Sequence, residues 1–154
     1  MEWNIQLAII GKIGLAMLAG GLLGLEREIA DKPAGLRTHM LVAGTSALLV
    51  SLSNSLIDTF RITSETNITP DPIRIVQAVI LGIGFIGAGT IMRRKESQEV
   101  EGLTTGASLL LAAALGICVA VEQLFIAFGV TVLAVTVLMV FGLTEKWFAS
   151  RRDG

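Results

Sequence analysis

Long apolar runs separated by short polar connections organise this chain from one end to the other. Five segments carry almost no charge and predict helices, at about residues 5–25, 38–57, 75–92, 102–121 and 124–143. At about 1.5 Å per residue each would measure about 27–32 Å, enough to cross the hydrocarbon core of a bilayer. Five soluble helices of this length would leave almost no residues for a water-facing surface. The pattern therefore predicts an all-α integral membrane protein, with residues 1–154 forming one transmembrane domain and no soluble domain.

The positive charges between these segments predict how the chain crosses the membrane. Nine Lys and Arg residues lie in the first and third connections and the C-terminal tail, and two lie in the other connections. Short cytoplasmic loops are enriched in Lys and Arg. We therefore expect these two connections and the C-terminus in the cytoplasm, and the N-terminus outside. Trp3 and Trp147 then fall at opposite bilayer faces, where aromatic anchors concentrate.

Composition narrows the function classes. The chain is 53% hydrophobic and 16% charged with a net charge of −1, which gives no reason to expect a nucleic-acid partner. Its one cysteine, Cys118, excludes an internal disulfide and a multi-cysteine metal site. No catalytic Ser/His/Asp arrangement, cysteine pair or paired-histidine zinc motif is present. We expect a protein that is not an enzyme.

Residues 82–89 match two incompatible patterns. Gly82, Gly84 and Gly87 have the spacing of a dinucleotide-binding fingerprint, which needs a strand before it and an amphipathic helix after it. Here the glycines lie in an uncharged run with basic flanks, which favours a membrane helix and no nucleotide. Gly84, Gly87 and Gly89 are then expected to pack helices closely, with a secondary role in lining a site. The same packing is expected at two small-residue pairs spaced four apart, Gly20/Gly24 and Ala78/Gly82.

Two hairpins of the chain resemble each other. Gly35-Leu36-Arg37-Thr38 opens the second apolar segment and Gly102-Leu103-Thr104-Thr105 opens the fourth, and a glycine-rich segment precedes each. This similarity predicts a parallel repeat of helices 1–2 and 3–4, with chance recurrence as the alternative. Thr38, and Thr104 or Thr105, would cap helix N-termini that carry partial positive charge toward the cytoplasm.

A charged cluster lies where the first segment ends and the second begins: Glu26, Arg27 and Glu28, then Arg37, Thr38 and His39. One interpretation is a cation or proton site, because Mg²⁺ favours oxygen ligands and typically uses one or two carboxylates with several waters. Glu26 and Glu28 would be the metal ligands. The other interpretation is an interfacial salt-bridge cluster, because residues two apart point roughly 200° apart on a helix. Both interpretations are open at this point.

Lys12 lies about seven residues into the first segment, an expensive position for a charge. Asp58, near the outer end of the second segment, is one candidate partner. The alternative is that Lys12 extends its aliphatic stem to the interface.

Taken together, four stretches resemble the MgtC/SapB family of bacterial inner-membrane proteins in order and spacing: Gly24–Glu28, Gly35–His39, Gly82–Ile91 and Gly102–Thr105. The resemblance implies a protein tied to magnesium homeostasis, with Mg²⁺ transport or ion handling at the cytoplasmic face. It also implies an alternative, a non-transporting regulator that binds partner membrane proteins such as the F-type ATP synthase. Longer members carry a C-terminal soluble domain of the ACT type.

Five helices make a thin bundle for an ion pathway, so we expect a homodimer or another homo-oligomer in the bilayer. The candidate ligand is Mg²⁺. The candidate binding residues are Glu26, Arg27, Glu28, Arg37, Thr38, His39, Gly84, Gly87, Gly89, Thr104 and Thr105.

Overall fold

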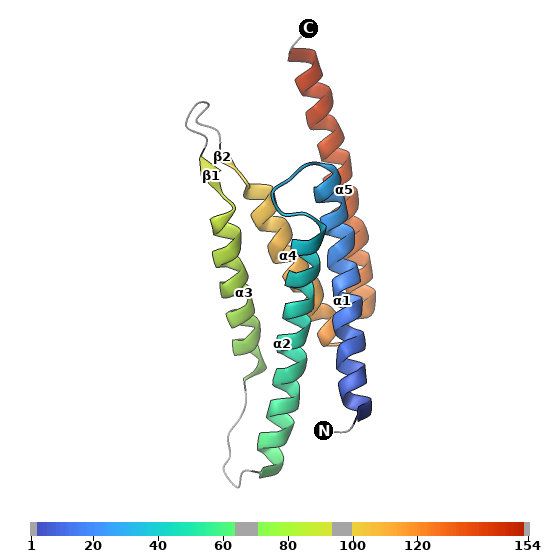
Figure 1. Ribbon diagram of the computed structural model, residues 1–154, viewed down its shortest axis with the longest axis vertical. Coiled ribbons are helices and arrows are strands. Elements are labelled where there is room, and N and C mark those ends of the chain that lie inside the picture. The colour runs from blue at the N-terminus through green and yellow to red at the C-terminus, as the bar shows by residue number, and fades with distance from the viewer. Residues whose placement is uncertain (1–2, 64–70, 94–99, 153–154) are drawn as a thin grey trace.

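A computed structural model describes residues 3–63, 71–93 and 100–152 (Figure 1). Within these ranges, five helices are long and apolar enough to cross a membrane, so the predicted all-helical membrane architecture is confirmed. The helices are α1 (Trp3–Ile29), α2 (Leu36–Thr63), α3 (Pro72–Gly89), α4 (Leu103–Ala120) and α5 (Leu124–Arg152). A short antiparallel ribbon, which the sequence did not predict, pairs β1 (Met92–Arg93) with β2 (Val100–Glu101).

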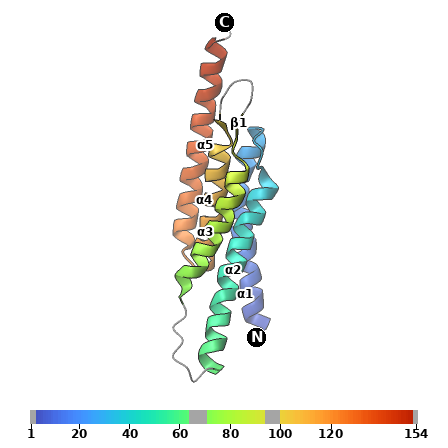
Figure 2. The same cartoon turned by 90° about the vertical axis from the view of Figure 1, so that its left-hand side faces the viewer.

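The helices run side by side, and their ends gather in two groups (Figures 1 and 2). The α1–α2 connection, the β1–β2 ribbon and the C-terminal part of α5 lie at one end, which we call the ribbon end. The start of α1, the end of α2 and the start of α3 lie at the other, the opposite end. The side of the membrane that each end faces, and the internal repeat, stay predictions.

Two helices end in the same way. Asp31 after α1 and Glu122 after α4 have positive φ angles of 56° and 64°. In each case the next N–H bonds to a carbonyl five residues earlier, Lys32 to Arg27 and Gln123 to Cys118. This Schellman arrangement satisfies the last carbonyls of the helix, usually with glycine at the left-handed position. Here an acidic side chain stands at both positions.

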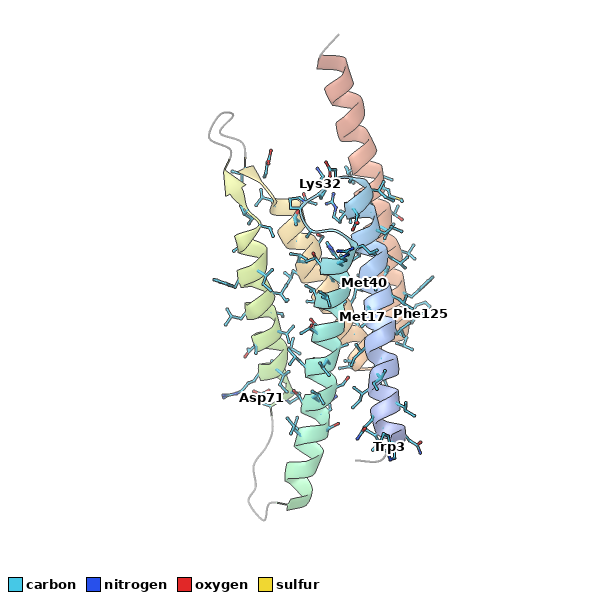
Figure 3. All side chains as sticks on the ribbon, in the orientation of Figure 1. Trp3, Met17, Lys32, Met40, Asp71 and Phe125 are labelled. Atoms are coloured by element: carbon cyan, nitrogen blue, oxygen red, sulfur yellow. The ribbon has the colours of Figure 1, made fainter. Side chains whose placement is uncertain are left out.

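Helices α1, α2 and α4 form the centre of the bundle, and glycines let their backbones meet. A Cβ on Gly24 would lie 2.7 Å from Cα of Leu36, and one on Gly116 of α4 would collide with the carbonyl oxygen of Ala43. The predicted close packing at Gly20 and Gly24 is therefore confirmed. Methionines fill the rest of the α1–α2 contact, with Met17 against Gly44 and Met40 against Gly21 (Figure 3).

Helix α3 contacts the bundle through one narrow face, spaced every four residues: Ile75, Val79, Ile83 and Gly87. Gly87 packs against Gly106 of α4, with a Cβ position 3.3 Å from its Cα. Nothing lies within 4 Å of a Cβ on Gly82, Gly84 or Gly89. The predicted packing role is therefore confirmed for Gly87 and wrong for the other three within one chain, because they lie on other faces of the helix.

Candidate functional site

Two charged side chains are buried at the end of α1, just inside the ribbon end. The two residues are Glu26, which is only 7% exposed, and Arg27, which is only 4% exposed. Arg27 Nε lies 3.1 Å from Glu26 Oε2, so the two form a buried ion pair. Ionisable groups at membrane depth are costly and usually mark functional positions. This pair is the core of the candidate site.

The pair has hydrogen-bonding capacity that its neighbours do not use. Among the described residues, Arg27 Nε, Arg27 Nη1 and Glu26 Oε2 are buried and have no hydrogen-bond partner. Arg27 Nε and Glu26 Oε2 are 3.1 Å apart and form an ion pair. The N–H does not point at the carboxylate oxygen well enough to form a hydrogen bond. Buried polar groups in proteins almost always have a partner, either protein or ordered water. The pair is therefore suited to bind water or a hydrated ion.

His39 lies beside this pair, fully buried, and connects α2 to α4. Its Nδ1 is 2.9 Å from the carbonyl oxygen of Gly35, and its Nε2 is 3.0 Å from Ser108 Oγ. Ser108 Oγ also donates to the carbonyl oxygen of Thr105 at 2.9 Å. An imidazolium would satisfy all three contacts at once. A neutral ring that donates from Nδ1 needs the Ser108 proton to turn toward Nε2 and away from the Thr105 carbonyl oxygen.

Glu28 has a different task from Glu26. Its Oε2 accepts a hydrogen bond of 2.7 Å from the N–H of Leu36, the first residue of α2. A carboxylate there satisfies a free helix N–H and complements the helix dipole. Glu26 instead turns toward α5, where its Oε1 lies 3.9 Å from a Cβ position on Gly142. The two carboxylates therefore do not meet, and the described residues contain no group of three or more metal-ligating side chains.

The predicted threonine caps are wrong. In α2 the first N–H is capped by Glu28, and Thr38 lies inside the first turn. In α4 the N-cap is Gly102, with φ of 91° and no side-chain cap hydrogen bond. Each helix begins directly after a glycine, which cannot cap with a side chain. Thr38, Thr104 and Thr105 therefore lie inside their helices and not at the N-cap positions.

The structure therefore divides the predicted site residues. Glu26, Arg27, His39 and Thr105 are buried at the ribbon end, while Arg37 and Thr104 are exposed there. Gly84 and Gly89 lie at open positions of α3, with nothing within 4 Å of a Cβ position. Sequence reasoning missed Ser108, which lies one turn after Thr105 and holds His39. Its signal was a second small polar residue on the buried face of an otherwise apolar helix.

Lys12 is paired with the turn between α4 and α5, nine residues after the start of α1. Its Nζ lies 2.8 Å from Oε1 of Glu122 and 3.4 Å from the carbonyl oxygen of Ala120. The Lys12 ammonium holds the pKa of the Glu122 carboxyl below its ordinary value. The side chain of Asp58, the partner proposed from sequence, lies outside the described residues.

Comparison with known proteins identifies related chains. The model of the MgtC family matches residues 13–147. Protein SapB of Bacillus subtilis (strain 168) is 39% identical over 117 residues, covering 76% of this chain and 49% of SapB. The protein named "Putative magnesium transporter YhiD" of Escherichia coli (strain K12) is 38% identical over 128 residues, covering 82% of this chain and 57% of YhiD.

Protein MgtC of Salmonella typhimurium (strain LT2) is 37% identical over 118 residues, covering 77% of this chain and 46% of MgtC. This chain spans about half the length of the curated relatives it matches. No solved structure matches it.

Proposed function

This chain belongs to the MgtC family, and we propose that it is a bacterial inner-membrane protein of magnesium homeostasis that handles ions at its ribbon end. The name of one relative, a magnesium transporter, supports the choice of ion. The observation that carries the proposal is the buried Glu26–Arg27 pair with unused hydrogen-bonding atoms. A purely structural pair in a membrane bundle would be expected to satisfy those atoms.

The Glu26–Arg27 pair is suited to bind a passing ion through its water shell, and it is not suited to hold a metal ion permanently. Mg²⁺ keeps several of its waters and needs only one or two carboxylates, so Glu26 can accept hydrogen bonds from the water shell of the ion. The Arg27 cation, 3.1 Å from that carboxylate, opposes permanent occupancy by a second cation. Arg27 therefore keeps Glu26 neutralised between binding events, and His39 offers a proton-binding group on the same side of the bundle.

Flux into proteoliposomes tests this proposal. The full chain is reconstituted with a Mg²⁺-sensitive dye inside the vesicles, and uptake is driven by an inward Mg²⁺ gradient. We expect uptake by the wild-type chain, loss of uptake in Glu26→Gln, and retention in Glu28→Gln, which keeps an acceptor for the Leu36 N–H. Absence of divalent uptake by the wild-type chain, together with no stabilisation by Mg²⁺, would refute ion handling.

A second candidate function is a non-transporting regulator that docks a membrane protein such as the F-type ATP synthase, or a second copy of this chain. The exposed face of α3 around Phe85 favours this second function. Phe85 is 82% exposed, and Gly82 and Gly89, on the same side of α3, are open and leave room for another helix to approach. Close approach of helices through small residues is a common mode of association in membranes.

Substitution on this face separates docking from folding. Gly82→Leu fills an open position on the Phe85 face of α3, whereas Gly129→Leu fills an equally open position of α5. If this face of α3 docks a partner, Gly82→Leu abolishes co-purification or crosslinking and Gly129→Leu retains it. Equal behaviour of the two variants would exclude the α3 face as the docking surface.

A further inference from the structure

A second charged pair lies away from the ribbon end, where α4 turns into α5, and is exposed. Lys12 of α1 and Glu122 of the α4–α5 turn are 2.8 Å apart, and their side chains are 29% and 74% exposed. The pair ties α1 to the end of α4 and still presents charged atoms outward. It is separate from the buried site at the ribbon end.

The neighbours of this pair are apolar and exposed. Val121 precedes Glu122, and Leu124 and Phe125 follow it at the start of α5. Phe125 is 90% exposed and points away from the bundle (Figure 3). Charged atoms directly beside outward apolar side chains are typical of the level where hydrocarbon meets lipid headgroups.

Polar positions on two other helices, α2 and α3, agree with this boundary. Measured from the ribbon end, Lys12 lies sixteen residues from Glu28 on α1. Similarly, Asn54 lies seventeen residues from Arg37 on α2, and Arg74 lies sixteen residues from Thr90 on α3. These separations correspond to about 24–26 Å along a helix, slightly less than the roughly 30 Å of a typical hydrocarbon core. Measured from the ribbon end, Lys12 and Glu122 therefore lie at about the level of the polar residues Asn54 and Arg74.

Helix α1 begins well beyond that level. Trp3 lies nine residues before Lys12, about 13–14 Å farther along the helix, at the far end of the bundle (Figure 3). The short helix α4, in contrast, ends at Ala120. If the bilayer surface reaches the start of α1 on one side of the bundle, it must lie closer to the ribbon end beside the α4–α5 turn, because α4 ends sooner.

We propose that the Lys12–Glu122 pair binds the headgroup of phosphatidylethanolamine, and that the bilayer surface dips to this level beside α4. The phosphate oxygens accept hydrogen bonds from the Lys12 ammonium, and the primary ammonium of the lipid donates to the Glu122 carboxylate. Both contacts are charge-assisted. The pair has no net charge, so an anionic headgroup gains no net attraction from it. The acyl chains lie on the exposed apolar side chains at the start of α5.

Lipid binding to the purified full chain tests the proposal. Detergent-solubilised protein is titrated with phosphatidylethanolamine or phosphatidylglycerol, and bound lipids are counted by native mass spectrometry. Lys12→Met removes the ammonium. Glu122→Asn removes the carboxylate and suits the left-handed backbone at that position. Arg74→Gln is the matched control, because Arg74 belongs to another exposed ion pair, with Asp71, at the start of α3.

We expect the wild-type chain to prefer phosphatidylethanolamine and each pair variant to lose about tenfold in affinity for it, with Arg74→Gln unchanged. Equal binding by the pair variants, or a preference for phosphatidylglycerol, would overturn the proposal.

A depth measurement keeps the proposal testable if those variants fold poorly. A spin label at Gln123→Cys, in a Cys118→Ala background, is placed in nanodiscs containing phosphatidylethanolamine. We expect a water-soluble nickel reagent to relax the label more strongly than oxygen does. Relaxation by oxygen alone would place the turn in hydrocarbon and refute the headgroup site.

Discussion

The contact between α1 and α2 makes a sharp prediction at Gly24. A methyl group on Gly24 would lie 2.7 Å from Leu36 Cα, 2.9 Å from the Gly35 carbonyl oxygen and 2.9 Å from His39 Cβ. All three are backbone or Cβ atoms, so rotation of a side chain cannot relieve the contact. Gly14, on the same helix, has nothing within 4 Å of a Cβ position. Gly24→Ala and Gly14→Ala therefore add the same methyl group in crowded and open surroundings.

The size of the effect follows from two opposing contributions. Alanine favours a helix over glycine by roughly 1 kcal/mol, and both variants receive this gain. Overpacking a well-packed contact costs about 1–3 kcal/mol, and only Gly24→Ala bears this cost. The free energies of unfolding of the two variants should therefore differ by about 1–3 kcal/mol, with Gly14→Ala at or above the wild-type chain.

Reversible unfolding of the purified chain in mixed micelles, with increasing SDS and helicity followed by circular dichroism, measures this difference. A parallel measurement of His39 ring signals reports whether the α1–α2 contact has opened, since the chain contains one histidine. If Gly24→Ala were as stable as Gly14→Ala, the backbone contact between α1 and α2 would be refuted.

Three further predictions concern helix ends and the exposed pair. Glu28→Ala removes the acceptor for the Leu36 N–H and should lower the free energy of unfolding by about 1 kcal/mol in the same titration; no change would show that the cap is not formed. Gly102→Ala should destabilise the chain more strongly than Glu28→Ala, because Gly102 has φ of 91° and a Cβ there collides with a carbonyl oxygen; a neutral result would contradict the left-handed backbone. The pKa of Glu122 is lowered by Lys12, so its contribution to stability is present above its ordinary value of 4.5 and is lost as the pH falls through the lowered pKa. Thermal unfolding should be measured from about pH 6 to about pH 3, a range that covers this titration. The wild-type chain should lose this contribution to its stability, and Lys12→Met should not.

The sequence predicted the helices well because each is a long apolar run with charged ends. It placed the ends less well, since α1, α2 and α5 extend beyond their apolar runs. The β1–β2 ribbon was missed because its strands are only two residues long and carry no strand periodicity.

The candidate site was predictable where its residues are close along the chain. Glu26, Arg27 and His39 come together because one short connection joins α1 to α2. The helical angle between residues two apart also indicated that Glu26 and Glu28 would face different neighbours, as they do. The partners from distant segments, Ser108 for His39 and Glu122 for Lys12, were missed, because helix packing determines them and no local pattern encodes it.

The central claim is that the buried Glu26–Arg27 pair serves ion handling rather than folding. The double variant Glu26→Leu/Arg27→Met tests it most directly, with unfolding and Mg²⁺ uptake measured on the same preparation. Replacing a buried ion pair by apolar residues of similar size is often neutral or stabilising. We therefore predict a double variant that is folded and at least as stable as the wild-type chain but does not take up Mg²⁺. Wild-type uptake by the double variant, or loss of its fold, would contradict the claim.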